Sequence, residues 1–88
     1  MKSAYMFFSD PGHGWLRVPL SELDGFRPSE FSYRDDVFAY LEEDCDVVGW
    51  LIHIGVEPGE FGVGVLDEGT DGESFVRGLA RFAVEVAS

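Results

Sequence analysis

The chain has 88 residues, enough for one small core, and we expect residues 1–88 to fold as a single domain. Six Lys and Arg oppose 17 Asp and Glu, which gives a formal net charge of −11 at pH 7. Nucleic acids and anionic membranes repel so acidic a chain, so both are excluded as direct partners. With 45% apolar and 15% aromatic residues, the sequence is also too hydrophobic for an acidic disordered tail.

Cysteine usage and the N-terminal residues favour a cytoplasmic location. Cys45 is the single cysteine, so neither an internal disulfide nor a zinc site of the Cys₄ or Cys₂His₂ type can form. The apolar run near the N-terminus stops at Asp10 and Pro11, short of a secretory signal. No stretch approaches the roughly 18 apolar residues of a membrane span.

The N-terminal half predicts two β-hairpins with a short helix between them. Gly- and Pro-rich or charged turns separate short apolar runs, which is typical of hairpin strands. The four runs are residues 4–8, 15–18, 31–33 and 37–41. Pro19 can open a short helix over residues 19–24, and Gly25 can close it.

Two main helices are expected in the second half. Apolar residues recur at helical spacing from Val47 to Ile54, after a cap at Asp46 and before a stop at Gly55. A second stripe, formed by Phe75, Leu79, Phe82 and Val86, predicts a C-terminal helix. Between them we expect a strand over 61–66 and an acidic loop over 67–72. The sequence therefore predicts an α+β fold, a small antiparallel sheet of three to five strands with two main helices packed on one face.

No motif for catalysis or for ligand binding is complete. An EF-hand register over 67–78 places Gly69 and Gly78 where carboxylate ligands are required. The Gly-rich segments lack both the third glycine of a dinucleotide fingerprint and the lysine of a phosphate loop. His13 and Cys45 leave open a small enzyme or a metal-binding domain, although the carboxylates around Cys45 disfavour the thiolate. We expect no enzymatic activity, no cofactor and no metal.

The carboxylates concentrate in three groups that the predicted elements place in turns or at strand ends. If these groups converge at one end of the sheet, they form a row of negative charge that imitates a nucleic-acid backbone. Such a row predicts a surface that binds a basic nucleic-acid-binding protein. The residues of this predicted partner-binding surface are Asp35, Asp36, Glu42, Glu43, Asp44, Asp46, Asp67, Glu68, Asp71 and Glu73.

Three alternatives remain for the acidic composition. It can be an ordinary solvated surface, although the charge exceeds the roughly 2–8 units that keep a small domain soluble. It can reflect adaptation to high salt, for which a lysine-poor surface is suited. The third alternative is an antitoxin-type or immunity-type partner of a basic protein that does not bind nucleic acid.

Two segments stand out, SDPGHGWLRV at 9–18 and YLEEDCD at 40–46, with Tyr33 between them. They resemble a family of small proteins of bacterial phages, plasmids and other mobile elements. The resemblance covers about the first 46–55 residues and implies a mobile-element origin without a catalytic role. In size and composition the chain is also similar to anti-CRISPR proteins, some of which mimic DNA. These similarities imply a monomeric inhibitor in the bacterial cytoplasm, which blocks the basic groove of a CRISPR surveillance complex by stoichiometric binding.

Overall fold

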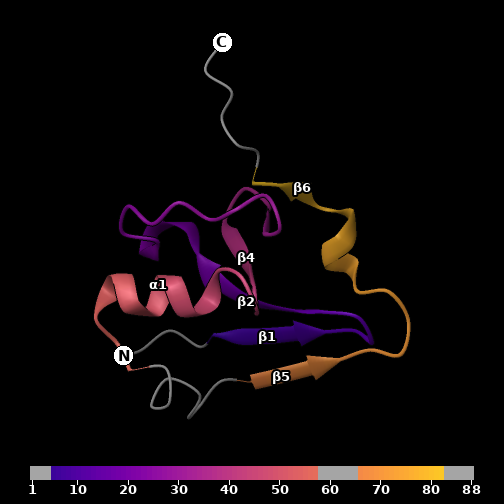
Figure 1. Cartoon of the computed structure of the whole chain (residues 1–88). Coiled ribbons are helices and arrows are strands. Elements are labelled where there is room, and N and C mark those ends of the chain that lie inside the picture. The colour runs from indigo at the N-terminus through magenta and orange to yellow at the C-terminus, as the bar shows by residue number, and fades with distance from the viewer. Residues whose placement is uncertain (1–4, 58–65, 83–88) are drawn as a thin grey trace.

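Six strands form one sheet in the order β5-β1-β2-β4-β3-β6 in the computed structural model, which describes residues 5–57 and 66–82 (Figure 1). The strands are β1 (Met6–Ser9), β2 (Gly14–Pro19), β3 (Tyr33–Arg34), β4 (Phe38–Glu42), β5 (Leu66–Gly69) and β6 (Ala80–Arg81). Five of them pair antiparallel, as predicted, and β5 adds a parallel edge beside β1. The α+β class is thereby confirmed, with one strand more than the predicted range.

Both predicted hairpins are present. In the first, Ser9 pairs with Gly14, and the carboxylate of Asp10 accepts the backbone N–H groups of Gly12 and His13 inside the turn. A Cβ at Gly14 would lie 2.3 Å from the ring of Phe7, so any other residue there would require that ring to move. The β3–β4 ladder forms the second hairpin, and the short 3₁₀ helix η1 (Leu20–Glu22) lies within the short helix predicted after β2.

The helix α1 (Val47–Ile54) begins and ends where the sequence predicts. Gly55 adopts a left-handed conformation, with φ of 81°, and this terminates the helix. The predicted capping by the Asp46 side chain is wrong, because its carboxylate makes no hydrogen bond to the first turn of the helix. It accepts hydrogen bonds from Ser29 and Ser32 instead, and so joins the loop before β3 to the start of α1.

The predicted C-terminal helix is wrong in the part that the structure describes. Residues Phe75–Gly78 form a 3₁₀ turn, η2, and Ala80–Arg81 form β6 against β3. Gly78 weakens any helix through this segment, and pairing with the edge of β3 supplies the backbone partners that a helix would otherwise provide. Val76, not Phe75, faces the core. Val86 lies outside the described residues.

The region before η2 also differs from expectation. The predicted strand over 61–66 falls outside the described residues except for Leu66, the first residue of β5. Asp67 and Glu68, predicted in a loop, lie within β5, and the loop begins at Thr70. The described residues therefore contain one α-helix, where two main helices were predicted.

The two faces of the sheet carry different cores. Alternation along β2 sends Leu16 and Val18 to the face that α1 covers and Trp15 to the other. The α1 side buries the cluster Leu16, Val18, Ala39, Leu41, Trp50 and Leu51. The opposite face buries the cluster Trp15, Tyr33, Tyr40 and Val76, so η2 packs on the side away from α1. Within the described ranges, no helix has the length and apolar character that crossing a membrane requires.

Candidate functional site

Two of the three predicted acidic groups lie at the same end of the sheet. The backbone N–H of Glu43 donates to the carbonyl of Gly14, and that of Thr70 donates to the carbonyl of Ser9, each at 3.0 Å. The loops that follow β4 and β5 therefore flank the β1–β2 turn. Asp35 and Asp36 lie in the β3–β4 turn at the opposite end of β4, so the expected convergence of all three groups is wrong for this pair.

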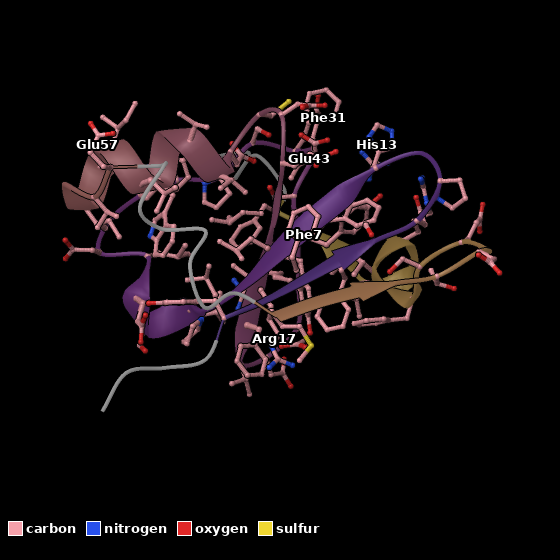
Figure 2. All side chains as sticks on the ribbon, turned by 90° about the horizontal axis from the view of Figure 1, so that it is seen from below. Phe7, His13, Arg17, Phe31, Glu43 and Glu57 are labelled. Carbon is pink, nitrogen blue, oxygen red and sulfur yellow. The ribbon has the colours of Figure 1, made fainter. Side chains whose placement is uncertain are left out.

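Four exposed carboxylates occupy this end of the sheet. We name them the acidic end: Glu43, Asp44, Asp71 and Glu73. Among the described residues, none of the four takes part in an ion pair. Desolvation, together with the neighbouring Asp44 and Glu42, raises the pKa of Glu43, as expected where like charges gather. Figure 2 places Glu43 and His13 on one side of the molecule and Arg17 on the opposite side.

Three of the predicted partner-binding residues serve the fold instead. Asp35 accepts the backbone N–H groups of Val37 and Phe38 at 2.8 and 2.7 Å and the Tyr40 hydroxyl at 3.0 Å. Although desolvation opposes them, these hydrogen bonds lower the pKa of Asp35. Glu42 and Asp46 are buried. Asp36 is exposed but lies away from the acidic end. The side chains of Asp67 and Glu68 are not among those that the structure describes.

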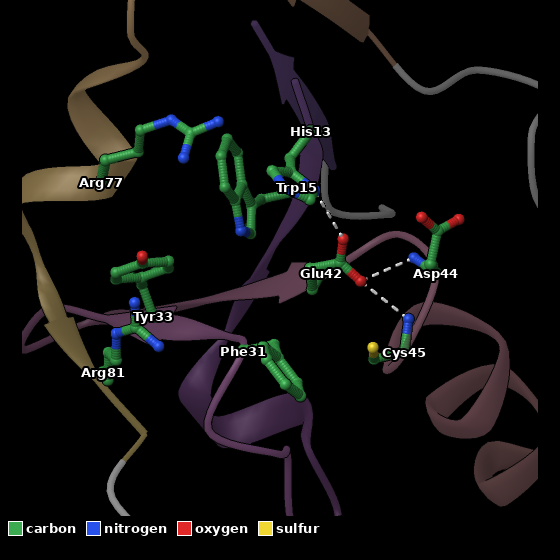
Figure 3. A pocket seen from close by; sticks show the side chains of 9 residues that line it. All are labelled: His13, Trp15, Phe31, Tyr33, Glu42, Asp44, Cys45, Arg77 and Arg81. Atoms are coloured by element: carbon green, nitrogen blue, oxygen red, sulfur yellow. Dashed lines mark hydrogen bonds and ion pairs between the residues drawn. The ribbon is translucent and has the colours of Figure 1, made fainter. Parts of the chain in front are cut away.

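A cavity of about 280 Å³ opens beside the acidic end (Figure 3). The lining residues are His13, Trp15, Phe31, Tyr33, Glu42, Asp44, Cys45, Arg77 and Arg81. Glu42 joins two of its walls, because its Oε1 accepts the backbone N–H groups of Asp44 and Cys45 at 2.8 Å each. Its Oε2 lies 3.3 Å from Nδ1 of His13. Sequence reasoning thus singled out His13 and Cys45, which do share one cavity.

The two residues form no activated nucleophile. Desolvation, the hydrogen bond to Glu42 and the surrounding carboxylates raise the pKa of the Cys45 thiol, which disfavours the thiolate at neutral pH. The imidazole of His13 is paired with Glu42. Within the described part of the chain, no group of three or more His, Cys, Asp or Glu side chains is arranged to hold a metal ion.

Two arginines, which sequence reasoning missed, line the same cavity. The guanidinium of Arg77 holds Asp10 through two hydrogen bonds, at 2.6 Å from Nε to Oδ2 and 3.0 Å from Nη2 to Oδ1. This pairing, with the backbone N–H of Ser74, keeps the pKa of the Asp10 carboxyl well below its usual range. Arg77 also lies 5.3 Å from the centre of the Trp15 ring, and Arg81 lies 5.3 Å from that of Tyr33.

The segments 9–18 and 40–46 meet at this cavity. The first supplies His13 and Trp15, and the second supplies Glu42, Asp44 and Cys45. No protein-family model, curated protein or solved structure matches the chain. A functional proposal therefore depends on the geometry of the acidic end and of the cavity.

Proposed function

We propose that the protein is a stoichiometric inhibitor, which uses its acidic end to occupy the basic nucleic-acid groove of a partner protein in place of DNA. The observation that carries this proposal is the gathering of Glu43, Asp44, Asp71 and Glu73 on loops at one end of the sheet, on a chain of net charge −11. Proteins that bind nucleic acid grip its phosphates with Lys and Arg, and the same groups attract carboxylates.

The spacing of the loops supports mimicry of a duplex. The acidic end spans β4, β2, β1 and β5, which are consecutive in the sheet. Three strand spacings of about 4.8 Å give about 14 Å between the loops after β4 and β5. This distance is comparable to the roughly 12 Å width of the DNA major groove, whose edges are rows of phosphates.

The immediate surroundings leave the acidic end negatively charged. Arg77 lines a second hollow with Asp71 and Glu73, but its two strong hydrogen bonds go to Asp10. A negative field at this surface speeds encounter with a basic groove and makes the association weaker at high salt.

A CRISPR effector complex is the target class that the resemblance to mobile-element proteins favours. Its groove binds a nucleic-acid duplex through the backbone, which is the part that a row of carboxylates imitates. An antitoxin-type role is the alternative, in which the partner is a basic protein that binds no nucleic acid and from which DNA does not displace the protein.

The test compares two variants of equal charge. One neutralises the acidic end with Glu43→Gln, Asp44→Asn, Asp71→Asn and Glu73→Gln. The control neutralises four other exposed carboxylates with Asp24→Asn, Glu30→Gln, Asp36→Asn and Glu57→Gln. Both variants lose four negative charges, so only the position of the lost charge differs.

Inhibition of target-DNA binding by a panel of purified CRISPR effector complexes is measured by fluorescence anisotropy at low and high salt. We expect the wild type and the control to displace DNA from one complex of the panel. Exposed ion pairs contribute about 0.2–1 kcal/mol each, so loss of four of them should make the acidic-end variant about fourfold to several-hundredfold weaker. Equal potency of the two variants contradicts the assignment of the surface, and no inhibition of any complex contradicts the target class.

A further inference from the structure

The cavity beside the acidic end contains a buried hydrogen-bond donor with no acceptor. Trp15 is 2% exposed, and its indole Nε1–H has no acceptor within the described residues. Figure 3 shows this nitrogen pointing into the space between Tyr33 and Glu42. The other tryptophan, Trp50, donates its Nε1–H to the carbonyl of Glu22 at 3.0 Å. Buried donors in folded proteins nearly always have acceptors, so the Trp15 N–H requires an acceptor that the described protein atoms do not supply.

The cavity wall formed by η2 and β6 adds further donors. A guanidinium carries five N–H groups, and Arg77 directs hydrogen bonds from only its Nε and Nη2 to Asp10. Arg81 makes one long hydrogen bond, 3.4 Å from Nη1 to the carbonyl of Glu30, and is otherwise exposed. Both side chains therefore retain N–H groups for a ligand anion.

The buried carboxylate of the cavity, that of Glu42, already has hydrogen-bond and ion-pair partners within the protein. Both carboxylate oxygens of Glu42 have partners, the amides of Asp44 and Cys45 at one and His13 at the other. The second carboxylate of the lining belongs to Asp44, whose side chain is exposed. The interior thus offers donors to a ligand and has no buried carboxylate that requires a cation.

The remaining walls are aromatic. The rings of Trp15 and Tyr33 meet edge to face, with centres 5.9 Å apart, and Phe31 lines the cavity while 51% exposed. The volume of about 280 Å³ lies just below the usual range of small-molecule pockets, roughly 300–1,000 Å³. A ring-sized molecule is therefore the appropriate ligand.

We propose that this cavity binds a small organic carboxylate with a flat apolar body. The carboxylate oxygens accept hydrogen bonds from the Trp15 indole N–H and the Arg81 guanidinium, and the apolar body lies against Tyr33 and Phe31. This site adjoins the proposed inhibitor surface at Asp44, which belongs to both, but its hydrogen-bond donors lie on the sheet face and on η2 and β6.

The first experiment titrates the folded protein with sodium benzoate and follows the two indole N–H signals in ¹H–¹⁵N correlation spectra. Each signal is first assigned to Trp15 or Trp50 from the resonances of its own residue. Benzylamine, which has the same ring and the opposite charge, and inorganic phosphate are the comparison probes. We expect benzoate to shift the Trp15 signal in a saturable manner and to leave the Trp50 signal in place. A non-saturating shift, or tighter binding of benzylamine or phosphate, overturns the proposal.

The second experiment removes one donor and compares it with a matched control. Arg81→Gln should weaken benzoate binding about tenfold, as expected for a hydrogen bond between charged groups. Arg34→Gln removes the same charge from the neighbouring strand β3, where Arg34 is exposed, stacks on the ring of Phe82 and does not line the cavity. The control should bind benzoate within about twofold of the wild type. Equal weakening by both variants overturns the assignment.

Discussion

Removal of the Ser32 hydroxyl tests the polar network beneath the junction of β4 and α1. Ser32 is completely buried, and its Oγ donates to the carboxylate of Asp46 at 2.5 Å and accepts the backbone N–H of Glu42 at 2.9 Å. Ser32→Ala leaves the amide of Glu42 without its acceptor, at a cost of about 1–3 kcal/mol. It also removes one of three donors to Asp46, which adds about 1 kcal/mol. We expect the free energy of unfolding to fall by about 2–4 kcal/mol in total.

That loss is a large part of the roughly 4–13 kcal/mol typical of a chain of 88 residues. Urea unfolding followed by circular dichroism measures it, with an unchanged m-value, and the thermal midpoint should fall by roughly 10–30 °C. Ser21→Ala is the matched control, because Ser21 is exposed on η1 and should stay within about 0.5 kcal/mol of the wild type. If Ser32→Ala also stays within that margin, the network does not stabilise the fold.

Two further predictions concern titrating groups. The Arg77 guanidinium, followed by the backbone N–H of Ser74, lowers the pKa of Asp10 in the folded state. Ionised Asp10 therefore stabilises the fold above the unfolded pKa of about 4, and this stabilisation is lost as the pH falls below that value. Arg77→Gln should therefore move acid unfolding, followed by circular dichroism, to higher pH, and an unchanged midpoint contradicts this linkage. Desolvation and the hydrogen bond to Glu42 raise the pKa of Cys45, so iodoacetamide at pH 7.5 should alkylate the exposed thiol more slowly in the folded protein than in urea. An equal or faster rate in the folded protein refutes this reasoning.

Local signals were enough to predict the first half of the fold. The turn at Asp10–Gly14 and the charged turn at Asp35 divide apolar runs into hairpins, and both positions keep that role in the structure. The spacing from Val47 to Ile54 predicted α1 because the periodic residues, the preceding loop and the left-handed Gly55 all agree. Where several local preferences favour the same element, tertiary structure has little reason to override them.

The second half depended on a tertiary interaction. The stripe at Phe75, Leu79 and Phe82 has helical spacing, but the edge of β3 lies within reach and β6 pairs with it. That ladder competes with a helix, and Gly78 makes the helix the weaker competitor. A pattern of side chains along one segment contains no information about an unpaired strand edge formed 46–48 residues earlier in the sequence.

The candidate sites were predictable only in part, for a related reason. The clustering of charge identified the acidic end. It could not distinguish the exposed Glu43 and Asp44 from Glu42 and Asp46, which are buried although they lie within two positions in the sequence. Burial depends on which side of β4 and α1 each residue faces. The cavity combines side chains from several strands and from η2, a segment predicted as helix, so no spacing in the sequence marked Arg77 as a lining residue.

The positions of the arginines reconcile an anionic protein with a cavity that binds a carboxylate. Arg17 lies 4.4 Å from the centre of the Phe38 ring, and Arg77 and Arg81 stack on the rings of the cavity wall. Such contacts hold cations against the sheet face opposite α1. At physiological ionic strength charges are screened within about 8 Å, so the nearest groups, and not the net charge of −11, set the potential inside the cavity. One chain can therefore offer a negative surface to a basic protein and two guanidinium groups to a small anion.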